Sequence, residues 1–544
     1  MVVVLPTEPR EQTADQQVEQ VLNRLGFGAR PGDVARVRAM GVDQWIGLQL
    51  APDRIADDAA NRLSASYETA ASGPGDLVRA SERAQELQRM LQVDTNTPSD
   101  STTRRDRRAA LLRDDPALRD QIRLAQRAMG DAQSARLARA VVSDRQLQEV
   151  MTDFWENHFS VYGGKGITRL LVPAYDRDVI RPHALGRFRD LLGAVAQSPA
   201  MLFYLDQWQS AADSTHSTLG ERGGRRSARA RQPARRGLNE NYARELLELH
   251  TLGVDGGYSQ QDVIDVARAL TGWTLVSRVH PDFTFRAQVH DADVKRVLGH
   301  TLPGGRGIDD GAAVLDILAR DPHTAHFIAR KLVVRFVSDT PSSALVERAA
   351  ATFMRTDGDI REVVRTIVTS TEFFSRAAYR VKVKSPFELV ASALRAVGAE
   401  GDTTLRSAQM VGALGQPIFG HQAPDGWPET GDAWINAGSI LARINFGMAL
   451  AADRLPGASL DHWTEASRLR DAARATQVDA VVTAFLGGHA SPDTREILMK
   501  GDNPLAARSV APTAGAMPPS RPVPLTGLAQ VVGLAIGAPE FQRR

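Results

Sequence analysis

The clearest pattern of apolar and polar positions predicts two amphipathic helices between residues 237 and 274. The first is predicted to begin near Asn239, because asparagine is a favoured N-cap residue, and to end at Gly253. The second opens on Ser259-Gln-Gln-Asp262, a variant of the capping box that marks helix starts. Apolar residues then recur at helical spacing, at Val263, Val266, Ala267 and Leu270.

The polar face of the first predicted helix carries candidate chemistry. At about 100° per residue, one sector holds Asn241, Arg244, Glu245 and Glu248. Buried carboxylates this close push one pKa upward, which is how a general acid is made, although Arg244 opposes the shift. Carboxylates beside an amide oxygen can also hold a divalent cation. The alternative is a solvated face with an Arg–Glu ion pair, as amphipathic helices usually have.

Helical patterns cover most of the remaining chain, so the predicted fold is mainly α, a single large multi-helical unit. The clearest β signal is the alternation of apolar and polar residues from Phe283 to Val289, which predicts a small β hairpin near residues 283–290. Four parts are expected along the chain: an N-terminal helical part (1–210), a mobile basic loop (211–237), a helical core that carries the polar face (238–500), and a Pro-rich segment with a C-terminal helix (501–544).

Two further stretches place histidines beside polar partners. Asn157 and His158 lie among a Trp and two Phe and precede a glycine-rich loop, which suggests a pocket wall; the alternative is an aromatic core with a hydrogen-bonded histidine. His290 and Asp291 follow the predicted strand, and such a pair can orient a base or ligate a metal. A single adjacent pair is also common by chance.

A loop rich in proline and glycine, residues 414–432, is predicted to bind a ligand. It contains Asp425 and Trp427, and Trp434 follows it. Long ordered loops with tryptophan are often binding elements, and tryptophan faces suit sugar rings. The alternative is a loop that its tryptophans pin to the core.

Composition narrows the function classes. The net charge of +2 implies no global attraction to nucleic acid or membrane. Seven arginines lie between positions 222 and 236, without the aromatic residues of a single-strand binding surface, so nucleic acid is not the expected partner and the role of this loop stays open. Cysteine is absent, which excludes disulfides and thiolate chemistry.

The sequence leaves the cell compartment open. No apolar run reaches the roughly 18 residues of a membrane span, and the N-terminus is not a recognisable signal peptide. The expected location is cytoplasmic if the chain is complete, and exported, in the periplasm or extracellular, if a leader was removed.

Several motifs together carry a resemblance to a known family. The central stretch NENYARELLELHTLGVDGGYSQQDV, followed by ARALTGW, resembles the signature of the bacterial domain of unknown function 1800 family. Segments LNRLGFG, FWENHF, HD…K…LG, KLVVRFV, VKSPFELV, GQP…DGWPE and EFQRR fit the same pattern, so the resemblance covers nearly the whole chain. It implies one continuous, mainly helical unit. It also implies that members are often exported and encoded beside a sulfatase-like family, although this chain shows no leader and its basic loop is longer than usual. Positions of the shared pattern are Asn157, His158, Asn239, Asn241, Arg244, Glu245, Glu248, His290, Asp291 and Trp427.

The leading hypothesis is an acid/base enzyme of the hydrolase type that acts on a glycan-type or other extended substrate. Glu245 or Glu248 would be the acid/base, Arg244 an electrostatic partner, and His158 would complete the catalytic group. The residues predicted to bind substrate are Asn157, Asn241, Asp425 and Trp427.

Two alternatives remain. One is a non-catalytic binding or accessory protein that works with a neighbouring sulfatase-like enzyme. The other is a structural metal-binding protein, with His290 and Asp291 as candidate ligands; the cofactor is unknown, and a divalent metal is the candidate. An enzyme requires Glu245, Glu248 and a histidine around one accessible concavity.

Overall fold

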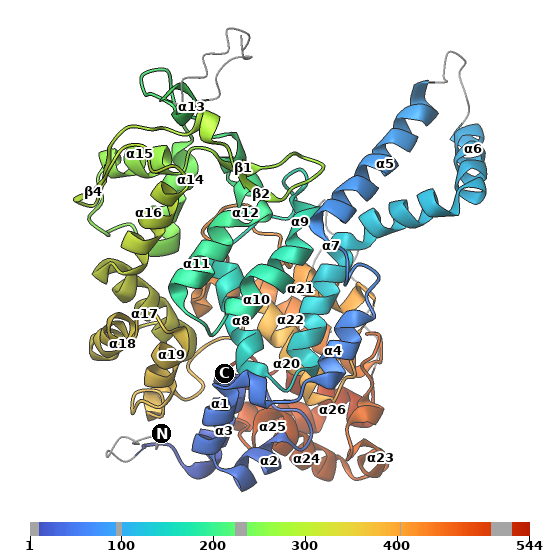
Figure 1. Ribbon diagram of the computed structural model, residues 1–544. Helices are drawn as coiled ribbons and strands as arrows, with labels where there is room; N and C mark the ends of the chain where they lie inside the picture. The colour runs from blue at the N-terminus through green and yellow to red at the C-terminus, as the bar shows by residue number, and fades with distance from the viewer. Residues whose placement is uncertain (1–9, 94–100, 223–236, 403, 502–524) are drawn as a thin grey trace.

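The computed structural model describes residues 10–93, 101–222, 237–402, 404–501 and 525–544. These residues form a mainly α-helical molecule whose strands are limited to two small antiparallel sheets (Figure 1). The prediction of a mainly α fold with a small hairpin is confirmed. No helix in the described ranges combines the length and the hydrophobicity needed to cross a membrane. Parts of the predicted basic loop and Pro-rich segment, residues 223–236 and 502–524, lie outside the described residues.

The N-terminal helices occupy one end of the molecule (Figure 1). The first begins at a capping box, in which the Thr13 hydroxyl accepts from the Gln16 amide and the Gln16 side chain accepts from the Thr13 amide. The buried Arg24 side chain donates to the carbonyl oxygen of Ala378 at 2.7 Å, which ties this end to residues far along the chain. These helices are α1 (Ala14–Arg24), α2 (Asp33–Met40), α3 (Val42–Gln49) and α4 (Asp58–Ala65).

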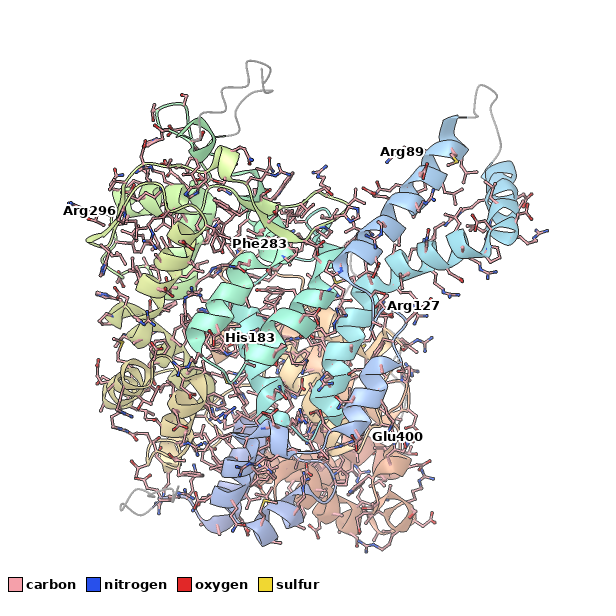
Figure 2. All side chains as sticks on the ribbon, in the orientation of Figure 1. Arg89, Arg127, His183, Phe283, Arg296 and Glu400 are labelled. Atoms are coloured by element: carbon pink, nitrogen blue, oxygen red, sulfur yellow. The ribbon has the colours of Figure 1, made fainter. Side chains whose placement is uncertain are left out.

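A helical arm projects from the body (Figure 1). It consists of α5 (Pro74–Val93), α6 (Ser101–Asp114) and the first part of α7 (Pro116–Val142). Figure 2 shows Arg89 on the outer part of α5 and Arg127 where α7 approaches the body. Buried residues of α7 begin only at Ile122, so the remainder of that helix packs into the core.

Helix α8 (Gln146–His158) runs through the centre of the body (Figure 1). Phe154, Trp155 and the following Phe159 are fully buried, which fixes the orientation of the helix end that carries Asn157 and His158. The helices that follow are α9 (Thr168–Ala174), the π-helical turn η2 (Tyr175–Ile180), α10 (Arg181–His183), α11 (Phe188–Gln197) and α12 (Pro199–Tyr204).

The two helices predicted around residues 239–270 form as expected. Asn239 is an N-cap whose side chain accepts from the amides of Asn241 and Tyr242, and Ser259 with Asp262 forms a capping box. The first helix changes to a π-helical turn at Leu246, which its sequence did not indicate. The elements here are α13 (Leu219–Arg222), α14 (Glu240–Glu245), the π-helical turn η4 (Leu246–Thr251), α15 (Gln260–Ala269) and α16 (Asp309–Ala319).

The predicted hairpin pairs with residues that precede it. Strand β2 (Phe283–Phe285) is antiparallel to β1 (Trp273–Leu275), with Trp273 opposite Phe285, and residues 287–289 form a 3₁₀ turn instead of more strand. A second hairpin, β3 (Lys295–Val297) with β4 (His300–Leu302), was not predicted. Lys295 is buried there, so the usual alternation of apolar and polar residues is absent.

Proline residues set the starts of two helices that matter for the site. Pro322 and Pro386 occupy first-turn positions after the N-cap residues Asp321 and Ser385. The side chains of these N-cap residues accept hydrogen bonds from backbone amides of the first turn. The helices of this region are α17 (Pro322–Phe336), α18 (Ser343–Arg355), α19 (Ile360–Val368), α20 (Pro386–Ala396) and α21 (Arg406–Ala413).

The C-terminal helices complete the body. Helices α22 and α26 approach closely where two glycines face each other. A Cβ atom at Gly447 would lie 2.6 Å from the carbonyl oxygen of Gly533, so a larger residue would not fit there. The chain then returns to the centre (Figure 1), where the Lys384 amide donates to the carbonyl oxygen of Gln542 and the Arg544 amide to that of Lys382. The helices are α22 (Ala437–Ala451), α23 (Ala466–Leu469), α24 (Arg474–Leu486), α25 (Pro492–Lys500) and α26 (Gly527–Gly537).

Candidate functional site

A cavity of about 780 Å³, counting the space open to solvent, lies where several segments that are distant in the sequence meet. Its walls come from α8, from α17, from the start of α20 and from the tryptophan loop at residues 416–434. Arg544 adds the C-terminal segment. Polar and aromatic residues of the lining include Arg136, Asp153, Glu156, Asn157, Arg335, Glu388, His421, Trp427, Glu429, Trp434 and Arg544.

Arginines connect the carboxylates of the cavity. Arg335 Nη2 lies 2.8 Å from Asp153 Oδ2, and its Nη1 lies 3.2 Å from both Glu388 Oε1 and Glu429 Oε2. Arg544 Nη2 pairs with the same Glu388 oxygen at 2.9 Å. Burial raises the pKa of Glu388, but the attraction of Arg544 and Arg335 outweighs burial, so that the pKa lies below its ordinary value. Glu388 is therefore ionised at neutral pH.

Glu156 differs from Glu388, because its surroundings raise the pKa instead of lowering it. Its Oε2 lies 3.1 Å from Arg136 Nη1, and its buried Oε1 has no hydrogen-bond partner among the described residues. Burial raises the pKa of Glu156 well above its ordinary value, and repulsion by the nearby Asp176 adds to the rise against the attraction of Arg136. A raised pKa favours the protonated form, which is the form that a general acid requires.

Asn157 holds the tryptophan loop in place over the cavity. Its Oδ1 accepts from the Trp427 amide at 2.6 Å, and its Nδ2 donates to the Trp427 carbonyl oxygen at 2.8 Å and to Glu429 Oε1 at 3.3 Å. Gly426 makes this approach feasible: its φ is +75°, and a Cβ atom there would lie 2.1 Å from the carbonyl oxygen of Asn157. Asn157 thus positions one aromatic and one acidic side chain of the site.

Aromatic rings form one wall of the cavity. The ring centres of Trp427 and His421 lie 4.5 Å apart, and those of Trp427 and Trp434 lie 6.0 Å apart. The Trp434 indole donates to the Pro428 carbonyl oxygen at 3.1 Å. His421 also contacts Asp425, with 2.8 Å between Nε2 and Oδ1, so that Asp425 lies at the edge of the same loop.

His158 lies next to Asn157 but outside the lining of the cavity. It is buried, with its Nε2 3.1 Å from the carbonyl oxygen of His250 and its Nδ1 2.9 Å from Lys331 Nζ. Burial lowers the pKa of His158 well below its ordinary value, and the positive charge of Lys331 lowers it further. A neutral ring donates from Nε2 to the carbonyl and accepts at Nδ1 from Lys331, so this histidine orients an amine.

The carboxylates predicted to be catalytic, Glu245 and Glu248, lie on α14 and η4 and are not part of the cavity lining. Burial raises the pKa of Glu245, Glu248 adds to the rise and Arg244 opposes it. The charge of Asp425 also raises this pKa. The catalytic role of Glu245 and Glu248 stays a prediction.

The other polar residues of that helix make local contacts. Arg244 Nη2 donates to Gln260 at 3.0 Å and lies 3.8 Å from Glu240, and the Tyr258 hydroxyl donates to Glu248 at 3.4 Å. Asn241 is exposed, and its amide donates to the Asn239 side chain. Roles for Arg244 in catalysis and for Asn241 in substrate binding likewise stay predictions.

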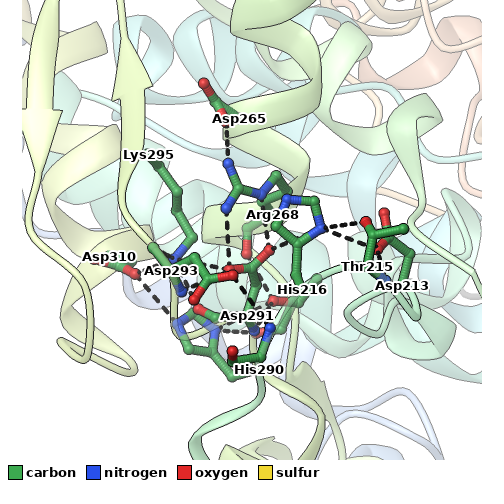
Figure 3. A network of polar contacts seen from close by, with 12 residues as sticks. Asp213, Thr215, His216, Asp265, Arg268, His290, Asp291, Asp293, Lys295 and Asp310 are labelled. Carbon is green, nitrogen blue, oxygen red and sulfur yellow. Dashed lines mark hydrogen bonds and ion pairs between the residues drawn. The ribbon is translucent and has the colours of Figure 1, made fainter.

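His290 and Asp291 belong to a separate buried polar network (Figure 3). Asp291 accepts from Arg268 through both oxygens, at 2.7 and 3.2 Å. His290 Nδ1 lies 2.7 Å from the Thr271 carbonyl oxygen, and its Nε2 lies 3.2 Å from Asp310 Oδ2. All four atoms are engaged by the protein, which favours a structural role for the pair.

Within the described ranges, no cluster of three or more His, Asp and Glu side chains is arranged to hold a metal ion. Lys295 shares the network with Asp310, at 2.8 Å from Oδ2. Metal binding by His290 and Asp291 stays an untested prediction.

The residues that sequence reasoning missed lie inside the motifs it singled out. Glu156 belongs to FWENHF, Arg335 to KLVVRFV, Glu388 to VKSPFELV, Glu429 to DGWPE and Arg544 to EFQRR. Each residue looks like an ordinary charge within its own segment. The recurrence of charged residues within the shared motifs was an available signal, but only the tertiary fold shows that these five side chains converge.

Comparison with known proteins gives one match. A family model described as a protein of unknown function, DUF1800, matches residues 20–543. None of the curated proteins and none of the solved structures matches the chain.

Proposed function

We propose that this chain, which belongs to the DUF1800 family, is an acid/base enzyme of the hydrolase type whose active site is the central cavity. The observation that carries the proposal is the division between two carboxyl groups on the same cavity. Glu156 has a raised pKa and Glu388 a lowered one. Environments that push the pKa values of neighbouring carboxyl groups apart are characteristic of acid/base sites.

The roles follow from the contacts of each group. Glu156 is the proposed general acid, because burial raises its pKa well above the ordinary value and so favours the protonated form. Glu429 is the proposed base, because it makes one ion pair, to Arg335, and one amide hydrogen bond, from Asn157. Glu388 is held by two arginines and serves to position Arg335 and Arg544.

The lining favours a neutral, hydroxyl-rich substrate. Besides the proposed acid Glu156, the lining holds three arginines and three other acidic side chains, so their formal charges cancel and no net charge attracts an ion. Tryptophan faces bind the apolar faces of sugar rings, and Trp427 and Trp434 supply such a surface. We therefore propose a glycan-type or other extended substrate. The three arginines counted above are Arg136, Arg335 and Arg544, and the three acidic side chains are Asp153, Glu388 and Glu429.

The test is a screen of the purified chain against chromogenic glycosides and acetyl esters, followed by two matched variants. Glu156→Gln should lower kcat by about 10²- to 10⁴-fold, the usual contribution of general acid catalysis. Glu245→Gln changes a carboxylate outside the cavity. Its kcat should stay within about threefold of the wild-type value, because no general acid is removed. The reverse result would move the active site to α14 and η4, as the helix pattern first predicted.

Absence of turnover in the whole panel would favour the alternative, a binding or accessory protein that works beside a sulfatase-like enzyme. Retained glycan binding by the wild-type chain, lost in Trp427→Ala, would then assign the cavity to recognition alone. Equal glycan binding by the wild-type chain and by Trp427→Ala would show that the cavity serves neither catalysis nor glycan recognition.

A further inference from the structure

The chain contains very few lysines. Among its 66 basic residues only six are lysine, at positions 165, 295, 331, 382, 384 and 500. Arginine stays charged at every physiological pH, whereas a buried lysine can lose its proton and become a nucleophile. A lysine in this arginine-rich chain can therefore supply a neutral amine, which arginine cannot.

Four of the six lysines are neutralised by a carboxylate. These pairs are Lys165 with Asp206, Lys295 with Asp310, Lys382 with Asp339 and Lys500 with Glu496. Lys331 and Lys384 have no carboxylate within 4 Å in the part of the chain that the structure describes. They differ in access, because Lys331 is partly exposed, whereas Lys384 is buried under Phe541 with its Nζ 2.7 Å from the Ser392 hydroxyl.

Lys331 lies one helical turn from the cavity. It shares a face of α17 with Phe327 and with Arg335, which lines the cavity. Its Nζ lies 5.5 Å from the centre of the Phe327 ring and 2.9 Å from His158 Nδ1. Since His158 Nε2 donates to the carbonyl oxygen of His250, Nδ1 carries the lone pair and receives a hydrogen from the amine.

The surroundings make the amine of Lys331 easier to deprotonate than an exposed lysine amine. Burial lowers the pKa of Lys331 to about 8, against the attraction of Glu429 and Asp425. Burial also lowers the pKa of His250, to about 3, and its two ring nitrogens are buried without a hydrogen-bond partner among the described residues. The ring centre of His250 lies 6.4 Å from that of His158, so neutral imidazoles surround the inner side of the amine.

We propose that Lys331 is a covalent binding site for a small aldehyde, held as an imine. The Nζ lone pair attacks the carbonyl carbon, and the carbonyl oxygen takes up a proton from solvent. The nitrogen passes a proton to His158 Nδ1, which gives the neutral carbinolamine. His158 returns this proton to the hydroxyl group, water leaves with the C–O electron pair, and the nitrogen lone pair forms the protonated imine; no oxidant or reductant is consumed. This site is independent of the proposed hydrolase activity.

The experiment is reductive trapping on the full chain. The protein is incubated at pH 7.5 with glycolaldehyde and sodium cyanoborohydride, and the rate of labelling at each lysine is read by peptide mass mapping. We expect Lys331 to react at least about tenfold faster than the exposed Lys500, because a larger fraction of its amine is neutral. Lys384 is the matched control, a buried lysine without a carboxylate partner, and should label slowest.

Two further measurements separate a binding site from a merely reactive amine. Labelling at Lys331 should saturate with glycolaldehyde concentration, and in urea all six lysines should react at similar rates. Labelling at Lys331 that is no faster than at Lys500, or that rises linearly without saturation, would overturn the proposal. Lys331→Arg should abolish the fast adduct while the labelling of the other lysines is unchanged.

Discussion

Single side chains decide the chemistry of the central cavity. Arg335 joins three carboxylates, Asp153, Glu388 and Glu429, that come from segments about 275 positions apart at the extremes. Glu156 differs because burial and the nearby Asp176 raise its pKa against the attraction of Arg136. Burial and the placement of the arginines together shift the pKa values of these two carboxyl groups in opposite directions.

The first residue-scale prediction concerns pH. Because the pKa of Glu156 is raised and its protonated form is the proposed acid, kcat should fall as pH rises through that pKa. The pKa of Glu388 is lowered, so this group stays ionised and should cause no loss until pH falls below its ordinary range. A pH–rate profile of the wild-type chain measures both limbs. An alkaline limb that persists unchanged in Glu156→Gln, measured on residual activity, would assign that limb to another group.

A second residue-scale prediction concerns Gly426. Gly426→Ala should destabilise the chain by about 1–3 kcal/mol or more, because it combines a positive φ with a direct clash against the Asn157 carbonyl. Gly415→Ala is the matched control: its φ is +103°, but nothing lies within 4 Å of its Cβ position, so it carries the strain alone. Urea unfolding measures both. Equal losses would mean that the clash with Asn157 relaxes at no cost.

At the scale of elements, helix ends were the most predictable feature, because caps are local chemistry. Asn239 and the Ser259–Asp262 capping box start their helices where the sequence placed them. The π-helical turn at Leu246 and the second hairpin were missed. Tertiary contacts produce both: the hairpin buries Lys295 against Asp310, a pairing that no local pattern encodes.

The buried network of Figure 3 should be a main support for the elements around it. Asp310→Asn leaves Lys295 and His290 without their shared carboxylate, and breaking a buried ion pair costs about 3–5 kcal/mol. Asp309→Asn, the exposed neighbour in the same first turn of α16, should cost at most about 1 kcal/mol from the helix dipole. The free energies of unfolding of the two variants test this, and similar values would show that the network adds little.

At the scale of the whole molecule, the cavity depends on a segment far from the rest of its walls. Arg544→Met keeps much of the side-chain volume but leaves the buried Glu388 with Arg335 as its remaining ion-pair partner, at a cost of about 3–5 kcal/mol. Arg543→Met removes a charge from the exposed neighbour and should change stability by less than about 0.5 kcal/mol. Thermal and urea unfolding compare the two; a stable Arg544→Met chain would contradict the predicted role of this ion pair.

The candidate site was only partly predictable from sequence for the same reason. Asn157 and Trp427 were predicted as site residues and line the cavity together. Glu245 and Glu248 attracted attention because helical spacing brings them together locally, whereas Glu156, Glu388 and Glu429 meet only after folding. Local periodicity reveals neighbours on one element, and a cavity built from separate elements is invisible to it.

The position of Arg544 in the cavity wall also orders events during synthesis. Helix α8 leaves the ribosome hundreds of residues before the segment at 541–544, so Asp153 and Glu156 are made long before the arginine that completes their surroundings. Domains begin to fold while synthesis continues, and contacts between distant segments are slow to form. Until the segment at 541–544 has been made, Glu388 lacks one of its two arginine partners. The walls of the cavity are therefore completed late, long after helix α8 has left the ribosome.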